Sequence, residues 1–270
     1  MELAIRALEH IGKNARVFLS HLSSLYSLMV LNFYWTFIAP FKKGQKGLSR
    51  EHVSYQCVFM GNKSISIVFL VSLFMGMIMA MQTAYLLKKF GVVMYVGSLV
   101  AVSMCRELGP LLTAIVIAGR AGAAITAELG TMKVAEEIDA LEVMGINPVR
   151  YLVVPRILAL VIMLPCLTMF ADLVGIYGGY LIGHYSINIP TGLYIQKTID
   201  ALVLKDIWTG LLKSFVFALI IGFIGCYEGL IVKGGAEGVG KATTISVVAS
   251  ITLIIFADCV LTSLFYFVFV

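Results

Sequence analysis

Five long apolar runs constrain the fold of this chain more than any other feature of its sequence. The run Ser64–Leu87 has 24 residues and no charged side chain. As an α-helix it would be about 36 Å long, enough to cross a hydrocarbon core of about 30 Å. We predict an all-α integral membrane protein, multi-pass, whose five transmembrane helices cover residues 64–87, 92–119, 157–183, 207–227 and 242–270.

The composition agrees with a membrane protein. Of the 270 residues, 60% are hydrophobic and 13% are charged, whereas a soluble domain has about 25% charged residues. The formal net charge of +5 therefore bears on membrane orientation, and the sequence has no motif for binding nucleic acid. None of the five cysteines forms a CxxC pair or a zinc-ligand spacing, so we predict no metal site.

A few ionisable residues lie inside the predicted spans, where an unpaired charge costs about 2.5 kcal/mol or more. Arg106 and Glu107 lie near the middle of the second span and form our candidate substrate site. A guanidinium can hold a phosphate with two parallel hydrogen bonds, or it can pair with the neighbouring carboxylate. For Asp172 and Asp258 we favour a structural role, and Lys213 can reach the outer interface.

The segment Val17–Phe41 is also long and apolar, but its polar residues are one-sided. Ser20, Ser24 and Ser27 share one helical face, which favours a helix lying in the membrane interface over a sixth span. We therefore divide the chain into 1–63, an interfacial helix with a polar cytoplasmic segment, and 64–270, the membrane domain.

Lysine and arginine are unevenly distributed between the segments that join the spans. They are frequent before the first span and after the second and fourth spans, so these segments are assigned to the cytoplasm. The N-terminus is then inside and the C-terminus outside. Two short outer segments, about 88–91 and 184–206, leave no outer soluble domain, so a substrate delivered from outside needs another protein to bring it.

The cytoplasmic loop after the second span contains a predicted amphipathic helix over Met132–Met144. Thr131 is a candidate N-cap, and Gly145 suits the position just after the helix end. Two interpretations are open for this helix: it docks on a partner protein, or it is an ordinary solvated loop helix. The candidate docking residues are an apolar stripe and the acidic residues near it: Val134, Glu136, Glu137, Ile138, Leu141 and Glu142.

The first span carries methionines and a glutamine on one face toward its outer end. Flexible thioethers suit an acyl chain of variable shape, although such methionines more often serve in plain packing. A tyrosine near the outer interface follows them, where a substrate that enters from outside would arrive. We add these residues to the candidate substrate-binding set, namely Met75, Met79, Gln82 and Tyr85.

One run has the spacing of a nucleotide-binding loop. Gly235–Lys241 fits GxxxxGK, but Ala242 stands where that motif needs a serine or threonine to hold magnesium. The run adjoins the last span, and no nucleotide-binding domain fits in the remaining chain. We predict no catalytic residue and no cofactor on this chain.

The stretch from Arg106 to Arg156, which contains RELGP and AGRAGAA, resembles the signature block of the MlaE/YrbE family of ABC-transporter permeases. The later run GGAEGVGKATT is similar to a stretch that this family carries between its last two spans. The resemblance implies five spans after an amphipathic N-terminal helix, in the cell inner membrane. It also implies a non-catalytic subunit that moves lipids, expected to be phospholipids, between the inner membrane and the outer envelope.

The same resemblance implies partners. They are a second copy of the chain, a cytoplasmic ABC ATPase that binds ATP and magnesium, and an MCE-domain lipid-binding protein outside. Helix 132–144 would then dock on the ATPase. The alternative is an ion-coupled secondary transporter that uses Glu107, Asp172 and Asp258 as a proton relay, which the absence of an evident inverted repeat disfavours. A membrane scaffold would leave the Arg106–Glu107 pair unexplained.

Overall fold

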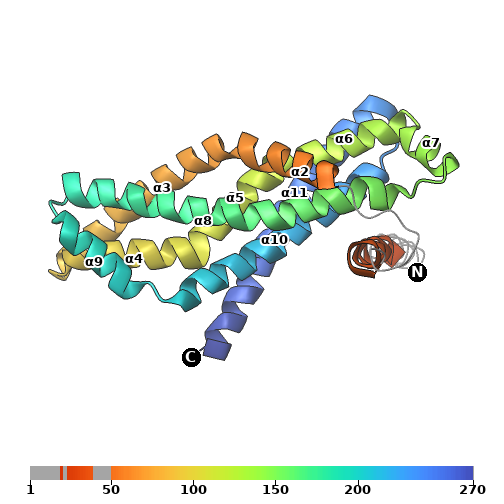
Figure 1. Cartoon of the computed structure of the whole chain (residues 1–270). Helices are drawn as coiled ribbons and strands as arrows, with labels where there is room; N and C mark the ends of the chain where they lie inside the picture. Colours follow the sequence, from red (N-terminus) through yellow and green to blue (C-terminus); the bar gives the residue numbers. More distant parts are fainter. Residues whose placement is uncertain (1–18, 21–22, 39–49, 270) are drawn as a thin grey trace, which may run out of the picture.

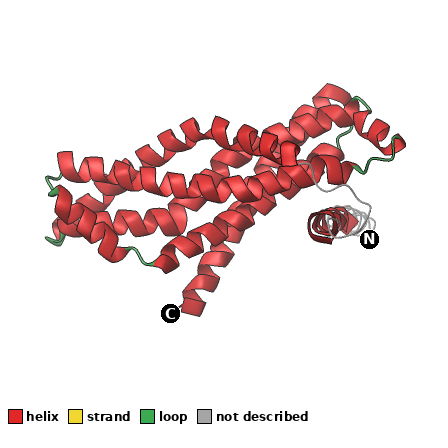
Figure 2. Ribbon diagram, viewed as in Figure 1, coloured by secondary structure: helices red, strands yellow, loops and turns green. Residues whose placement is uncertain are grey.

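The computed structural model describes residues 19–20, 23–38 and 50–269. Every regular element among them is a helix (Figure 2). The bounds, in which η marks short π- or 3₁₀-helices, are η1 Tyr34–Ile38, α2 Arg50–Cys57, η3 Val58–Asn62, α3 Lys63–Lys89, η4 Val93–Tyr95, α4 Val96–Ser103, η5 Met104–Leu108, α5 Gly109–Ile117, η6 Ala118–Gly122, α6 Ala123–Val134, α7 Glu137–Val143, η7 Val149–Val153, α8 Val154–Tyr185, α9 Thr191–Ala201, α10 Leu204–Leu230 and α11 Gly235–Phe269.

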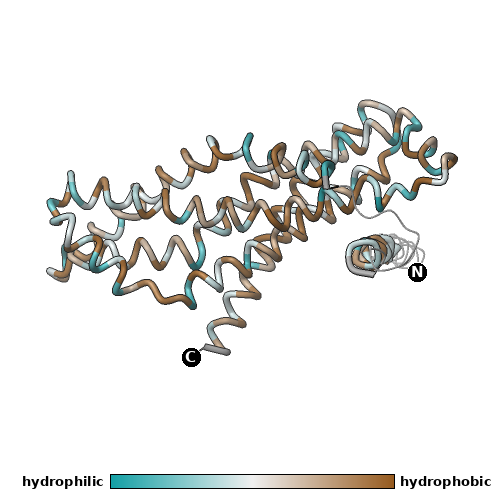
Figure 3. Tube along the Cα trace, viewed as in Figure 1, coloured by the Kyte–Doolittle hydropathy of each residue, from teal (hydrophilic) through white to brown (hydrophobic). Residues whose placement is uncertain are grey.

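Five helical stretches in the described part of the chain are long and apolar enough to cross a membrane, which confirms the predicted number. They run longer than the apolar runs because hydropathy marks the part of a helix inside lipid, whereas the helix itself continues into polar sequence. Figure 3 shows apolar residues dominating the long helices between the two ends of the bundle. The five stretches are Glu51–Lys89, Val93–Val134, Val149–Tyr185, Leu204–Leu230 and Gly235–Phe267.

The N-terminal helix lies across the bundle instead of along it. Its described part is helical over 23–38, and Figure 1 shows it end-on, beside the end of the bundle that carries α7. Leu28 packs into the main hydrophobic core, and the guanidinium carbon of Arg150 lies 5.1 Å from the ring centre of Trp35. This stretch is not among the candidate spans. Residues 19 and 20 are also helical, and the rest of the predicted helix Val17–Phe41 lies outside the described part.

Glycines bring α3 and α8 into close contact. A Cβ atom at Gly76 would lie 1.8 Å from the carbonyl oxygen of Gly175, and one at Gly178 would lie 2.3 Å from that of Leu73. Only residues without a side chain allow two membrane helices to approach so closely. The glycine repeat of α8 therefore serves packing within this chain.

The predicted outer segment 184–206 is not a simple loop, because α9 forms within it. Tyr194 anchors α9: its side chain is buried against α4 and α8, and its hydroxyl donates to the carbonyl of Ile176 at 3.3 Å. Burial raises the pKa of the Tyr194 phenol, so the hydroxyl keeps the proton that it donates. The hydroxyl of Ser98 on α4 also donates to the carbonyl of Lys197 on α9, at 2.8 Å.

The predicted start of the cytoplasmic helix Met132–Met144 is wrong. α6 runs through this position, and the hydroxyl of Thr131 donates to the carbonyl of Ala127 four residues back. Thr131 is thus inside a helix and is not an N-cap. The chain breaks instead at Glu136, whose φ of 59° is in the left-handed region, and the shorter helix α7 follows.

The predicted end of that helix is confirmed. Gly145 has a φ of 74°, a conformation that glycine adopts without steric cost. The backbone N–H of Gly145 donates to the carbonyl of Glu142, and that of Ile146 donates to the carbonyl of Leu141, both at 2.9 Å. This pair of bonds is a Schellman motif, which satisfies carbonyls left without partners at a helix end.

The topology can be tested with two exposed positions at opposite ends of the bundle. Val143 at the end of α7 and Phe90 after α3 are 89% and 76% exposed. In a background without native cysteines, a membrane-impermeant thiol reagent applied to whole spheroplasts should label Phe90→Cys but not Val143→Cys. Inverted vesicles should give the opposite result. Labelling of both positions from the same side would contradict the five-span topology.

Candidate functional site

The π-helix η5 carries the predicted charge pair at the junction of α4 and α5. Its wide turn is visible in the backbone, because the N–H of Gly109 donates to the carbonyl of Met104 five residues back. The next residue, Pro110, has no N–H and cannot continue the hydrogen-bond ladder, so the carbonyl of Cys105 loses its donor. Such π-bulges commonly lie at functional sites.

Gly210 allows α10 to approach this irregular turn. A Cβ atom at Gly210 would lie 2.1 Å from the carbonyl oxygen of Cys105 and 3.2 Å from the ring of Pro110. Asp206 and Lys213 stand four residues before and three residues after Gly210, so they share its helical face. The close contact at Gly210 therefore brings one acidic and one basic side chain of α10 onto η5.

A pair between Arg106 and Glu107, one of the two alternatives given above for the arginine, does not form. The Nε atom of Arg106 lies 3.2 Å from Oδ1 of Asp206. The other carboxylate oxygen of Asp206 accepts a hydrogen bond from the backbone N–H of Val203, which closes the start of α10. No other ion pair or hydrogen bond of Arg106 occurs in the described part of the chain, so its two Nη groups remain available to a ligand.

Glu107 belongs to a second, tighter cluster around Lys213. The ammonium of Lys213 donates to Glu107 at 2.5 Å and to the hydroxyl of Thr262 at 2.7 Å. It also lies 2.9 Å from Oδ1 of Asp258, an ion pair that is not aligned as a hydrogen bond. The Thr262 hydroxyl donates in turn to the Glu107 carboxylate. The side chain of Lys213 is 1% exposed, so the expectation that it reaches the outer interface is wrong.

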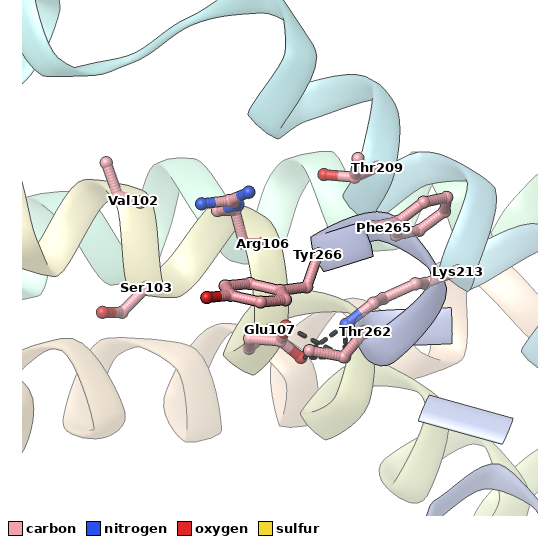
Figure 4. Close-up of a pocket in the computed structure, with 9 residues that line it drawn as sticks. All are labelled: Val102, Ser103, Arg106, Glu107, Thr209, Lys213, Thr262, Phe265 and Tyr266. Carbon is pink, nitrogen blue, oxygen red and sulfur yellow. Dashed lines mark hydrogen bonds and ion pairs between the residues drawn. The ribbon is translucent and has the colours of Figure 1, made fainter. Parts of the chain in front are cut away.

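One pocket between α4, η5, α10 and α11 is lined by Arg106, Glu107, Lys213 and Thr262. Its volume is about 240 Å³. Figure 4 shows Lys213 directed toward Glu107 and Thr262, while the guanidinium of Arg106 points away from that group. The remaining wall consists of small, polar and aromatic side chains, namely Val102, Ser103, Thr209, Phe265 and Tyr266.

The other four predicted substrate residues do not line this pocket. Met75 and Met79 are half-buried on α3, and Met79 packs against the apolar cluster at the outer end. Gln82 is exposed. Tyr85 lines a separate cavity of about 480 Å³ at the outer end of α3. The predicted set therefore divides into the charged pair in the pocket and a second group along α3.

Asp172 of α8 lies against Gly109, at the start of α5. Its side chain is buried, its Oδ1 has no hydrogen-bond partner in the described chain, and a Cβ atom at Gly109 would meet this oxygen at 1.7 Å. Asp172 is separate from the Lys213 cluster. In the described part of the chain, no hydrogen bond or ion pair joins Asp172 to Glu107 or Asp258, which a relay through the three carboxylates would need.

The predicted docking residues on the cytoplasmic side also divide. Ile138 is buried in the main core and Leu141 is half-buried against it, so both contact the protein itself. Val134 and the acidic residues Glu136, Glu137 and Glu142 are exposed. Val143 and Met144, at the end of α7, are exposed apolar residues that the predicted set does not contain. The predicted apolar stripe assumed one continuous helix over 132–144, whereas the chain breaks at Glu136.

Comparison with known proteins identifies the family. Residues 53–264 match the family described as Permease MlaE. The chain belongs to the MlaE permease family. The matched segment contains all the charged residues of the ion pairs described above for η5, namely Arg106, Glu107, Asp206, Lys213 and Asp258.

Named relatives of this MlaE permease come from bacteria and a plant. A probable ABC transporter permease of Rickettsia typhi is 40% identical over 211 residues, which cover 78% of this chain and 82% of the relative. One from Synechocystis is 40% identical over 224 residues, 82% and 84% of the two chains. The chloroplastic protein trigalactosyldiacylglycerol 1 of Arabidopsis thaliana is 39% identical over 206 residues, 76% of this chain and 59% of the plant protein.

The contact at Gly210 predicts a specific loss of stability in the MlaE permease. Gly210→Ala places a methyl group against the carbonyl of Cys105, so α10 must shift away from η5 at a cost of about 1–3 kcal/mol. We expect a lower melting temperature of the purified chain in detergent. Gly240→Ala is the matched control, because nothing lies within 4 Å of its Cβ position. Equal melting temperatures for the two variants would contradict the proposed contact.

Proposed function

We propose that this permease is the membrane subunit of an ABC transporter that moves phospholipids between the inner membrane and the outer envelope. Relatives at about 40% identity are named probable ABC transporter permeases, which supports the transporter class. The plant relative is named after a glycolipid, which favours a lipid substrate. The observation that carries the proposal is the half-exposed guanidinium of Arg106 within a membrane pocket.

Arg106 is the group that can bind a phosphate in this pocket. Its side chain is 42% exposed and uses Nε for Asp206, so both Nη groups can form a bidentate contact with phosphate oxygens. Lys213 is unsuited to this role because it is buried and already has three partners. We assign Lys213 to positioning: it holds Glu107, and through it η5, against α10 and α11.

A second copy of the chain would complete the lipid site. The pocket of about 240 Å³ is smaller than the roughly 300–1,000 Å³ typical of small-molecule sites, so it suits a head group but not two acyl chains. α11 supplies one wall of the pocket, and only 17% of its apolar window is buried within the described chain. A homodimer that packs along α11 would cover this face and enlarge the site.

Two further partners follow from the proposal. The exposed end of α7 offers Val143 and Met144 next to Glu142, which suits a groove on a cytoplasmic ATPase that supplies ATP hydrolysis. At the other end, α9 and short turns form the outer surface, without an outer soluble domain among the described residues. An MCE-domain lipid-binding protein would carry lipid to or from that surface.

The ion-coupled alternative is less well supported. The ion pairs around the pocket join three carboxylates to two cations, so one carboxylate is in surplus and a proton could bind there. The separate position of Asp172 and the family match favour the ABC transporter.

The phosphate role predicts the behaviour of Arg106 variants. In the complex reconstituted with its ATPase and MCE partner, Arg106→Ala should reduce lipid transfer by tenfold or more, because a charge-assisted bidentate contact contributes about 1.5–3 kcal/mol. Arg106→Lys should recover part of the activity, since an ammonium keeps the charge but not the planar fork. Transfer of a fluorescent phospholipid between vesicles measures both variants.

The control is Lys213→Met, which removes a positioning residue and should lower the melting temperature as well as transfer. Arg106→Ala should keep a normal melting temperature and normal assembly, because its side chain is half-exposed. A well-folded Arg106→Ala complex with full lipid transfer would contradict the assignment of the phosphate to Arg106.

The exposed end of α7 predicts a coupling defect. Val143→Asp places a carboxylate in the apolar contact with the ATPase, while leaving the fold intact because Val143 is 89% exposed. We expect weaker co-purification of the ATPase and less lipid transfer per ATP hydrolysed. Val203→Asp, at an exposed outer position, is the matched control. Unchanged co-purification and coupling in Val143→Asp would exclude α7 as the docking element.

A further inference from the structure

Two cations surround one aromatic ring outside the charged pocket. Phe59 lies in η3, and the ammonium of Lys63 is 4.8 Å from its ring centre. The guanidinium carbon of Arg120, in η6, is 5.9 Å from the same ring centre. Arg120 also donates a hydrogen bond to the hydroxyl of Ser64. Residues far apart in the sequence thus form one small basic cluster between α3 and η6.

No carboxylate of the described chain neutralises this basic cluster. Neither Lys63 nor Arg120 takes part in an ion pair there, and their contacts are limited to a ring and a hydroxyl. Both residues lie in helices that are candidate membrane spans. Two cations without a carboxylate partner in the described chain can bind an anion from outside the chain, such as a lipid head group.

The depth of the cluster matches the level of lipid head groups. α3 has 27 residues from Lys63 to Lys89, a length of about 40 Å, close to the thickness of a bilayer with its head groups. Lys63 and Lys89 therefore lie at opposite interfaces. Arg120 contacts the residue next to Lys63, so it lies at the same depth, on the side assigned to the cytoplasm.

An exposed apolar stripe extends from the cluster toward the membrane centre. The spacing of four, three, four and four residues after Lys63 keeps one helical face of α3. Every member of the stripe is exposed in the described chain. An acyl chain whose phosphate lies at the cluster can follow this stripe, which comprises Ile67, Leu70, Phe74 and Ile78.

We propose that Lys63, Arg120 and Phe59 form a binding site for the phosphate of an anionic phospholipid in the cytoplasmic leaflet. The two cations bind the phosphate, and the apolar stripe of α3 holds an acyl chain. This site lies on the outside of the bundle and is separate from the Arg106 pocket. It does not depend on which substrate the transporter moves.

Native mass spectrometry of the full chain tests the site. The chain is released from micelles that contain equal amounts of dioleoyl phosphatidylglycerol, which carries a net negative charge, and dioleoyl phosphatidylcholine, which does not. The wild-type chain should retain phosphatidylglycerol preferentially. Lys63→Gln should reduce this preference about fivefold, the effect of one basic residue near an anionic head group, and Lys63→Glu should abolish it. Arg120→Lys should retain most of it.

A matched control isolates the site. Lys197→Gln removes a similar contact, an ammonium 5.0 Å from the ring centre of Tyr95, and should leave the preference unchanged. The proposal is overturned if Lys63→Gln and Lys63→Glu keep the wild-type preference, or if Lys197→Gln lowers it equally. Displacement of the lipid by millimolar inorganic phosphate would also overturn it, because the site would then bind a free anion.

Discussion

The structure of the pocket depends on how the buried charge of the Lys213 ammonium is compensated. The side chain of Lys213 is 1% exposed. Its charge is stable there because Glu107, Asp258 and Thr262 surround the ammonium. These three partners come from η5 and α11, while Lys213 comes from α10. One buried charge therefore ties three helices together. Removing it would leave two carboxylates without their shared partner, which is why we treat Lys213 as the structural centre of the site.

The same arrangement leaves Arg106 available for function. Because Glu107 is bound to Lys213 and turned toward α11, Arg106 on the neighbouring position of the wide π-turn meets Asp206 through a single nitrogen. Asp206 is itself fixed by the start of α10. The guanidinium is thus oriented by one carboxylate and keeps its remaining donors open on the pocket. A positioned, incompletely paired cation inside a membrane is the chemical basis of the proposed phospholipid site.

The sequence predicted the features that depend on local composition, and missed those that depend on which helices meet. Apolar runs predicted five spans, and the charge pair predicted the pocket. Lys213 and Asp258 lie more than 100 residues from Glu107, so only the packing of α10 and α11 against η5 could bring these three residues together. The break at Glu136 was missed because no glycine or proline marks it, and Thr131 satisfied its hydroxyl inside α6.

A cryo-electron microscopy structure of the full chain with its co-purified lipid would test the central claim most directly. Our account predicts a phosphate within hydrogen-bond distance of the Nη groups of Arg106, with Lys213 still bound to Glu107 and Asp258. A lipid phosphate held by Lys213 after it releases these carboxylates, or an Arg106 side chain fully enclosed by protein with no lipid in the pocket, would contradict it.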